Sequence, residues 1–507
     1  MKYVIMRKIE IAVLWLLLIA LVPGCSASPN DHSATKEDAK TLIWVIPGLV
    51  RLSSGDDAPG QQWREAVDEA LRRKGADFTV RFLPVGSIID GYVATGGDGL
   101  WYAEKILQMM ESGEQVDLFY MGGTPASGDW YMRAWQAGAS EPLDEWLESG
   151  SARVVYEKYP QTVWDAMRIN GSIHGLYKGI AVGLQYGVQF YDERLSEHPI
   201  NRLALTGDIS SLMTATPDGI TPYARITGMP QEIAGMLGME YIAPGIAFDR
   251  GTAVAFFEHE SFSRFAAAMR DMHELGYMAP YATEFGEEPR EDLYWGIQSQ
   301  PDIFAYPDDS ISFYPIAAPD VTSEKGALCI SSRSEYKDEC KQLLEWLFED
   351  PEFANLVAYG IEGIQYKLDE NGIARSISGG AGPDVLQPGL TGLFHLAAPC
   401  DDYYAGVSRR ALGYMETLAA TALTGFHFDD RGWEEVIANL DEIVKRYTEP
   451  AEVAGQRAPS LVAGNDPDWE LTLKSLNLEL SAAGIHGMIN EVNRQYEAWK
   501  TLYSPAR

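Results

Sequence analysis

The sequence predicts an α/β protein built from at least two lobes, and two observations carry this prediction. The chain has 507 residues, of which 46% are hydrophobic, so it exceeds the size at which a single hydrophobic core stops growing. Strand-like and helix-like apolar patterns alternate along it from residue 41 onward. Such alternation is typical of a mostly parallel sheet covered by helices.

The first strand-helix-strand unit follows directly. Residues 42–46 form a continuous apolar run, as in a strand buried on both faces, and Pro47 with Gly48 ends it. Apolar residues then recur at helical spacing over 63–71, and residues 78–82 alternate apolar and polar side chains as a second strand. The same reasoning predicts helices around 106–110, 262–272, 343–347 and 485–499, and strands around 116–120, 173–182 and 327–330.

The amino-terminal end has the pattern of a secretion signal. Basic residues precede the apolar run 11–22, which is too short for the roughly 20 residues of a membrane-spanning helix. Gly24 directly before Cys25 resembles the bacterial lipobox, in which the cysteine is diacylated. We therefore expect a lipoprotein signal peptide over 1–24, lipidation at Cys25, and a lipid anchor and flexible tether over 25–40. A plain signal peptide cut near Ala27 remains the alternative.

Composition excludes several classes of function. The 40 basic and 73 acidic residues give a formal net charge of −33, which repels phosphate backbones, so no nucleic-acid partner is expected. An aromatic fraction of 11% excludes a disordered acidic chain. Once Cys25 carries lipid, Cys329, Cys340 and Cys400 are too few for a disulfide framework or a zinc site, although a bridge between two of them stays open.

Catalytic signatures are missing from the sequence. It contains no nucleophile elbow, no phosphate-cradling loop and no His-Glu-x-x-His motif. Asp466, Asp468 and Glu470 alternate as calcium ligands do, but Pro467 intervenes and no glycine permits the sharp turn, so surface acidity is the preferred interpretation. We expect no catalytic residues, no metal site and no cofactor.

Aromatic residues gather where strands and loops end. Tyr120 ends a predicted strand, and Asp129 with Trp130 follows the next loop. In open α/β sheets, ligands lie outside the carboxyl ends of the strands. Aromatic rings there stack on the apolar face of a sugar, while a carboxylate accepts its hydroxyl hydrogen bonds. The competing interpretation is that each ring is a core residue, and for any single ring it is the stronger one.

Several motifs, in order along the chain, resemble the family 1 extracellular solute-binding lipoproteins of carbohydrate ABC importers, of the long Gram-positive kind. Directly after the matching segment 170–176, Tyr177 stands where this family usually has proline. The matching segments are 111–118 (ESGEQVDL), Gly138 with 141–147 (EPLDEWL), 170–176 (NGSIHGL), 359–366 (YGIEGIQY), 424–429 (TGFHFD), and 482–485 (AAGI) with Glu491, Gln495 and Trp499.

The resemblance implies a two-lobed, periplasmic-binding-protein-like class II fold with an interlobe cleft, hinge crossings and extra C-terminal helices. It places residues 41–177 plus 331–358 in the first lobe. Residues 182–319 plus 367–507 form the second lobe and the C-terminal helical region. Residues 200–248 match nothing in the family.

The resemblance also implies a function. The chain is expected to capture a carbohydrate, in particular an oligosaccharide, by hinge closure and to deliver it to ABC permease subunits. It would act as a monomer on the extracellular face of the cell membrane, touching the membrane through its lipid anchor only. A surface-anchored glycoside hydrolase and a sensory sugar-binding lipoprotein remain alternatives. The expected ligand-binding residues are Tyr120, Asp129 and Trp130 in the first lobe, Tyr186 and Tyr306 across the hinge, and Glu362 in the third interdomain passage.

Overall fold

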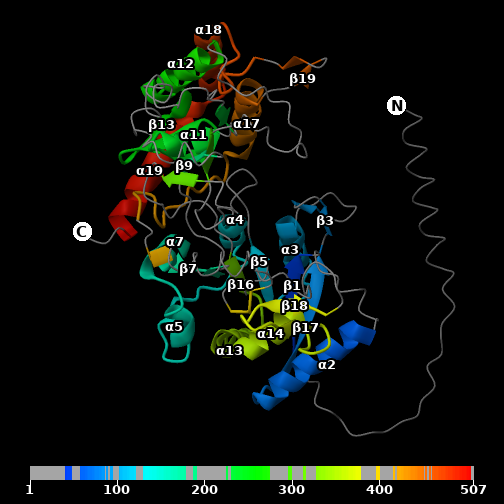
Figure 1. Cartoon of the computed structure of the whole chain (residues 1–507). Helices are drawn as coiled ribbons and strands as arrows, with labels where there is room; N and C mark the ends of the chain where they lie inside the picture. Colours follow the sequence, from blue (N-terminus) through cyan, green and yellow to red (C-terminus); the bar gives the residue numbers. More distant parts are fainter. Residues whose placement is uncertain are drawn as a thin grey trace, which may run out of the picture. The chain divides into compact units, whose positions relative to one another are not determined.

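The structure, a computed structural model, divides into two units, Met1–Ala39 and Lys40–Arg507 (Figure 1). The N-terminal predictions, including Cys25, lie outside the described residues. No helix in the described ranges is both long and apolar enough to cross a bilayer. The structure describes residues 40–47, 58–85, 87–89, 92–94, 102–121, 130–177, 186–190, 224–226, 230–274, 295–299, 312–315, 327–377, 396–399, 415–416, 420–449, 452–453, 456–457 and 459–503.

A mixed sheet forms the centre of the first hydrophobic core. Among the described residues it has five strands in the order β2-β1-β5-β16-β8. β1 pairs in parallel with β2 and β5, as predicted, whereas β16 runs antiparallel to both β5 and β8. A continuous apolar run shows that a strand is buried on both faces but not which way it runs. The strands are β1 (Lys40–Pro47), β2 (Phe78–Val85), β5 (Leu118–Met121), β8 (Leu176–Tyr177) and β16 (Ala327–Ile330).

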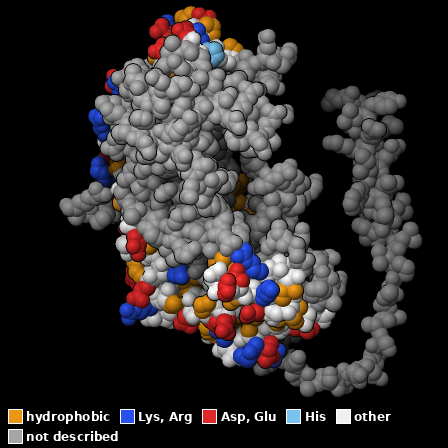
Figure 2. Space-filling model, in the orientation of Figure 1, with side chains coloured by type: hydrophobic (Ala, Val, Ile, Leu, Met, Phe, Trp, Pro, Cys, Tyr) orange, Lys and Arg blue, Asp and Glu red, His pale blue; other side chains and the backbone are white. Residues whose placement is uncertain are grey.

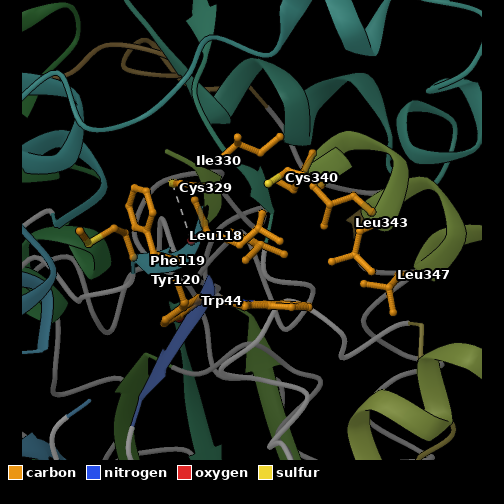
Figure 3. Close-up of a cluster of buried hydrophobic side chains, with 14 of the residues drawn as sticks. Trp44, Leu118, Phe119, Tyr120, Cys329, Ile330, Cys340, Leu343 and Leu347 are labelled. Atoms are coloured by element: carbon orange, nitrogen blue, oxygen red, sulfur yellow. Dashed lines mark hydrogen bonds between the residues drawn. The ribbon is translucent and has the colours of Figure 1, made fainter. Parts of the chain in front are cut away.

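Helices supply the rest of this core. The apolar side chains of α13 point toward Leu118 and Ile330 of the sheet, whereas Phe119 and Cys329 lie on the side of the strands away from this helix (Figure 3). Asp350 caps α14 by accepting hydrogen bonds from the backbone N–H groups of Glu352 and Phe353. The helices are α2 (Ala58–Arg73), α3 (Tyr102–Glu111), α4 (Trp130–Gln136), α5 (Asp144–Leu147), α6 (Arg153–Tyr156), α7 (Gln161–Met167), α13 (Lys337–Glu349) and α14 (Pro351–Tyr359).

The first core continues beyond α14. The hairpin of β17 (Tyr366–Leu368) and β18 (Ala374–Ser376) places Ala374 in that core, and Leu396, Ala397 and Met415 belong to it as well. These positions were expected in the second lobe, which the family resemblance places over 367–507. The hairpin follows α14 directly, and its buried side chains pack where the helix already lies. Two further ribbons are β3 (Ser87–Ile89) with β4 (Tyr92–Ala94) and β6 (Arg168–Ile169) with β7 (Ser172–Ile173).

A second core gathers around an antiparallel sheet in the described ranges, β11-β12-β13, and a cluster of phenylalanines. Phe256, Phe257 and Phe262 pack edge to face, with ring centroids 4.7 to 5.1 Å apart. Part of the unmatched segment 200–248 therefore builds this core. Its elements are α11 (Pro230–Met236), β11 (Glu240–Ala243), β12 (Ile246–Asp249), β13 (Thr252–Ala255), η1 (Phe256–Glu258), α12 (Glu260–Glu274), α17 (Glu434–Thr448), α18 (Trp469–Ala482) and α19 (Ile485–Tyr503).

A separate mixed sheet, within the described strands, has the order β10-β14-β9-β15. Its central strands β14 and β9 are antiparallel, and β10 joins β14 in parallel. Its strands are β9 (Tyr186–Phe190), β10 (Ala224–Ile226), β14 (Trp295–Ser299) and β15 (Ser312–Pro315), and a short ribbon joins β19 (Glu452–Val453) to β20 (Gln456–Arg457).

On the face shown in Figure 2, acidic and basic side chains are interspersed over the described surface.

Candidate ligand-binding site

The carboxyl ends of the parallel strands β1 and β5 form the edge where a ligand is expected. Tyr120, next to the end of β5, is only 6% exposed and belongs to the first core. Beside it, the Tyr102 hydroxyl donates to the Val45 carbonyl at 3.1 Å. Burial raises the pKa of Tyr102 well above its usual value, so this hydroxyl stays protonated and remains a donor. At this edge Tyr120 is part of the packed wall beneath the site.

Trp130 is the first residue of helix α4, the next described element after β5. Its side chain is half-buried, and the Arg133 guanidinium lies 5.7 Å from the centroid of its ring. Arg133 in turn forms an ion pair with Asp430, with 3.5 Å between Nη2 and Oδ2. One helical turn therefore holds a cation against the ring. A partly exposed indole held in this way is suited to stacking on a flat apolar ligand face.

The other predicted site residues are placed less fully. Asp129 and Tyr306 lie outside the described residues, and of Tyr186 only the backbone, at the start of β9, is described. Glu362 is exposed in the turn between α14 and β17, where it forms a backbone bridge with Tyr366. The structure thus places Tyr120 on β5 and Trp130 at the start of α4, the next described element, whereas Glu362 belongs to a separate turn.

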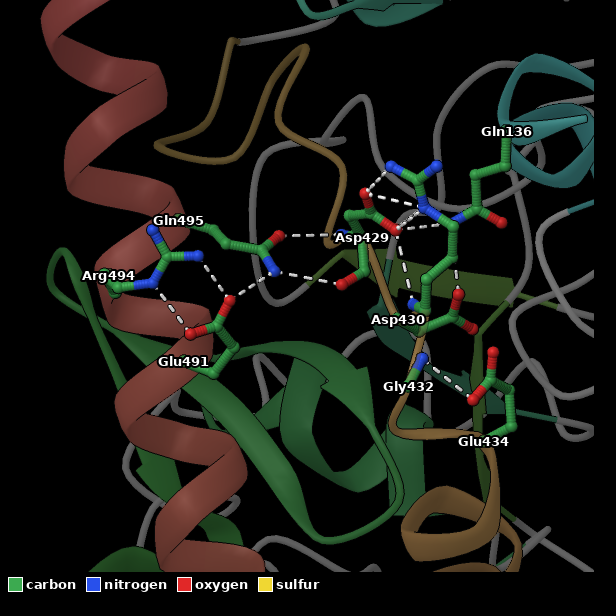
Figure 4. Close-up of polar contacts among 9 residues, drawn as sticks. Gln136, Asp429, Asp430, Gly432, Glu434, Glu491, Arg494 and Gln495 are labelled. Atoms are coloured by element: carbon green, nitrogen blue, oxygen red, sulfur yellow. Dashed lines mark hydrogen bonds and ion pairs between the residues drawn. The ribbon is translucent and has the colours of Figure 1, made fainter. Parts of the chain in front are cut away.

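A polar network at the far end of α4 was not anticipated from the sequence (Figure 4). The side-chain amide of Gln495, on α19, accepts from the backbone N–H of Asp429 at 2.8 Å and donates to its carbonyl at 2.9 Å. The Gln136 amide, on α4, donates to the carboxylates of Asp429 at 2.9 Å and Asp430 at 3.1 Å. Asp429 and Gln495 are both matched positions of the family resemblance, which was the available signal.

Charge compensation keeps this network ionised. The Arg431 guanidinium, hydrogen-bonded to both carboxylate oxygens of Asp429, lowers the pKa of Asp429. Glu491 accepts from Arg494 at 2.5 and 2.8 Å and from Gln495 at 2.9 Å. These bonds lower the pKa of Glu491 to about 2. Both carboxylates therefore remain charged acceptors at neutral pH.

The cysteine and acidic candidates are also placed. Cys329 and Cys340 are free and buried, and burial raises the pKa of both thiols, while Cys400 lies outside the described residues. The expectation that Asp466 lies on the surface is wrong, because its side chain is only 3% exposed. Its Oδ1 accepts a hydrogen bond from the backbone N–H of Asp468 at 2.9 Å. It stabilises the start of α18. Within the described ranges, no group of three or more His, Cys, Asp or Glu side chains is placed to hold a metal ion.

The chain is similar to known proteins chiefly in its fold. A domain of unknown function, DUF3502, matches residues 422–501. No curated protein matches the sequence. The N-glycan transport solute-binding protein NgtS from Streptococcus pneumoniae is 14% identical, with a TM-score of 0.60 over 92% of this chain and 100% of that one.

Two further structures extend this comparison. NgtS in complex with Man1GlcNAc is 16% identical, with a TM-score of 0.52 over 92% of this chain and 99% of that one. An HMO-binding, ABC-transporter-associated solute-binding protein from Bifidobacterium longum infantis is 12% identical, with a TM-score of 0.55 over 91% and 99%. These matches show that the chain has the two-lobed α/β fold of solute-binding proteins.

Proposed function

We propose that this chain is the solute-binding component of a carbohydrate ABC importer. The observation that carries the proposal is a fold shared over at least 91% of the chain with solute-binding proteins, one of them solved with a glycan disaccharide. The half-buried Trp130 at the carboxyl edge of the first sheet supports it, because a sugar ring stacks on such a surface. The chemistry required is binding alone, so the chain acts as a receptor and not as an enzyme.

Capture follows from differential affinity. A carbohydrate that touches both lobes stabilises the closed form by the difference between its affinities for the closed and open forms. Trp130, which packs against the first core, supplies a stacking platform in the first lobe. Asp129, Tyr186, Tyr306 and Glu362 are proposed as further contacts. Permease subunits then recognise the closed shape and receive the ligand.

The proposed place of action is the extracellular face of the cell membrane. Residues 1–24 direct export, Cys25 carries the lipid, and 25–40 tether the folded body. The chain acts as a monomer in this arrangement and delivers its ligand to the permease from a tethered position. Mass spectrometry of the mature chain from the membrane fraction tests this part. A diacylated cysteine at the new N-terminus supports it, and an unmodified N-terminus near Ala27 contradicts it.

A thermal-shift screen tests ligand class. The purified protein is heated with monosaccharides, the Man1GlcNAc disaccharide, longer oligosaccharides, peptides and polyols. A true ligand at one hundred times its dissociation constant stabilises the folded state by about 2.7 kcal/mol. We expect a rise in Tm with an oligosaccharide and no hydrolysis products. Products would identify a glycoside hydrolase instead, and a response confined to peptides would retain the fold and overturn the function.

Trp130→Ala should weaken carbohydrate binding by about tenfold, because removal of the ring exposes apolar sugar surface to water. Trp130→Phe should lose less, since a smaller ring remains. Calorimetric titration measures both dissociation constants. Tyr156→Ala on α6 is the matched control, because it also removes a half-buried ring, one whose centroid lies 5.5 Å from that of Trp164. Equal affinity in wild type and Trp130→Ala would remove Trp130 from the site.

A further inference from the structure

Residues 425–430, which we call the clasp, contact both hydrophobic cores. Phe426 packs in the second core, with its ring centroid 5.4 Å from that of Tyr496 and 5.7 Å from that of Trp499. The next residue turns to the first core, since the ring centroid of the buried His427 lies 6.4 Å from that of Tyr131 on α4. One short segment therefore contacts an aromatic residue of each core, Tyr496 of the second and Tyr131 of the first.

The contacts of the clasp alternate along its sequence. Phe428 packs against the second core, as Phe426 does, whereas Asp429 binds Gln136 of α4. Gly425, at the start, has a φ of +80°, and a Cβ there would lie 2.9 Å from the backbone oxygen of Asp165 at the end of α7. An extended chain alternates its side chains in this way. The clasp thus interleaves two sets of contacts and cannot lose one without disturbing the other.

Asp429 is hydrogen-bonded both to α19 of the second core and to α4 of the first core. The Gln495 amide pairs with its backbone as a neighbouring strand would, and fixes it to α19. The carboxylates of Asp429 and Asp430 both accept hydrogen bonds from the side-chain amide of Gln136. Asp430 also forms an ion pair with Arg133. Arg133 lies against the Trp130 ring. A continuous set of contacts therefore runs from α19 through Asp429 and Asp430 to the proposed stacking platform.

We infer that the clasp couples the orientation of the two cores to the pose of Trp130, and that Gln136 and Gln495 are its positioning residues. This assigns a task to the start of the DUF3502 segment, whose matched range opens at residue 422. The effect on ligand affinity rests on the proposed function. The effect on core orientation does not, so it is measured without ligand.

The ligand-free experiment measures the distance between the cores. Spin labels are attached through Glu65→Cys on α2 and Ser475→Cys on α18, both exposed positions, with Cys25 and Cys400 replaced by serine. Gln136→Glu places a third carboxylate against Asp429 and Asp430, and like charges at that separation repel. We expect a broader distance distribution with a different mean. Gln136→Arg keeps a hydrogen-bond donor at this position and should retain the wild-type distance distribution. Gln62→Glu, at an exposed position on α2, is the control for the added negative charge.

The second readout is affinity for the carbohydrate identified in the thermal-shift screen. Gln136→Glu and Gln495→Ala should each weaken binding by about five- to tenfold, and the double variant by little more than either, because both open the same clasp. Circular dichroism confirms that each variant folds. Gln495→Ala is spin-labelled in the same way as Gln136→Glu. If both variants give the wild-type distance distribution, the clasp inference is overturned whatever the ligand. If the distributions change but no wild-type carbohydrate binding exists, the proposed function fails and the clasp stands.

Discussion

Asp117 shows how one carboxylate can hold three parts of the first core. It has no exposed surface and accepts from the Ile43 backbone N–H at 2.7 Å, the Gln115 amide at 2.6 Å and the Ser334 hydroxyl at 2.5 Å. These donors belong to β1, to the turn before β5 and to the turn after β16. The aspartate of the matched segment 111–118 is therefore a structural residue in this protein.

Asp117→Ala should lower the free energy of unfolding by about 2–4 kcal/mol, because it leaves buried donors without an acceptor. Urea unfolding followed by circular dichroism measures the loss. Asp338→Ala is the control, since the Asp338 side chain is 97% exposed, and it should change stability by less than about 0.5 kcal/mol. A loss at Asp117 no larger than at Asp338 would show that these hydrogen bonds contribute nothing net.

Asp144, in the matched segment 141–147, fixes the turn of the other matched segment, 170–176. It accepts from Arg168 Nη1 at 2.6 Å, from the Ile173 backbone N–H at 2.9 Å and from the Ser172 hydroxyl. Burial works to raise the pKa of Asp144, but these three donors outweigh it and hold the pKa below its usual value. The ionised form is therefore favoured by folding.

The pH dependence follows from that direction. A carboxylate whose pKa is lower in the folded state stabilises the fold above its unfolded pKa of about 3.9, and this contribution disappears as the pH falls through the folded pKa. Asp144→Asn should cost about 1–3 kcal/mol at pH 7, and the difference from wild type should shrink below about pH 4. Urea unfolding across this range tests it. A difference that stays constant down to acid pH would contradict the charge-based account.

At the scale of elements, local sequence patterns located many of the helices and strands. They did not predict which distant segments pair or pack together. The apolar runs gave β1, β5 and β16, and helical spacing gave α2, α12, α13 and α19. The antiparallel direction of β16 and the packing of Ala374, Leu396 and Met415 in the first core depend on contacts between distant segments, which periodicity does not encode. The antiparallel sheet β11-β12-β13 lies partly in the segment that resembles nothing in the family.

Gly464 illustrates an element junction that only glycine permits. Its φ is +67°, and a Cβ there would lie 2.1 Å from the backbone oxygen of Met269 on α12. Gly464→Ala should cost about 2–4 kcal/mol in unfolding free energy, because backbone strain and a clash with a backbone atom add. Gly432→Ala is the matched control, with a φ of +85° and nothing within 4 Å of the added carbon, and should cost about 1–2 kcal/mol. Equal losses in urea unfolding would show that α12 moves aside without cost.

At the scale of the whole molecule, the sequence predicted the two-lobed fold, whereas its ligand-binding residues remain predictions. Strand ends and aromatic residues are both visible in sequence, so Tyr120 and Trp130 could be named, but the burial of Tyr120 in the core could not be foreseen. The fastening of Asp429 by Gln136 and Gln495 could not, since these residues are separated by 293 and 66 positions. A side-chain amide also leaves no periodic signal. Family resemblance marked Asp429 and Gln495 without indicating what they do.

Carbohydrate capture is tested by calorimetric titration of the purified protein with the oligosaccharide panel, Man1GlcNAc included. We expect saturable binding of a carbohydrate, weakened about tenfold by Trp130→Ala, with the sugar recovered unchanged from the calorimeter cell. Absence of binding to every carbohydrate, together with saturable binding of a peptide, would overturn carbohydrate capture and leave the fold with a different ligand.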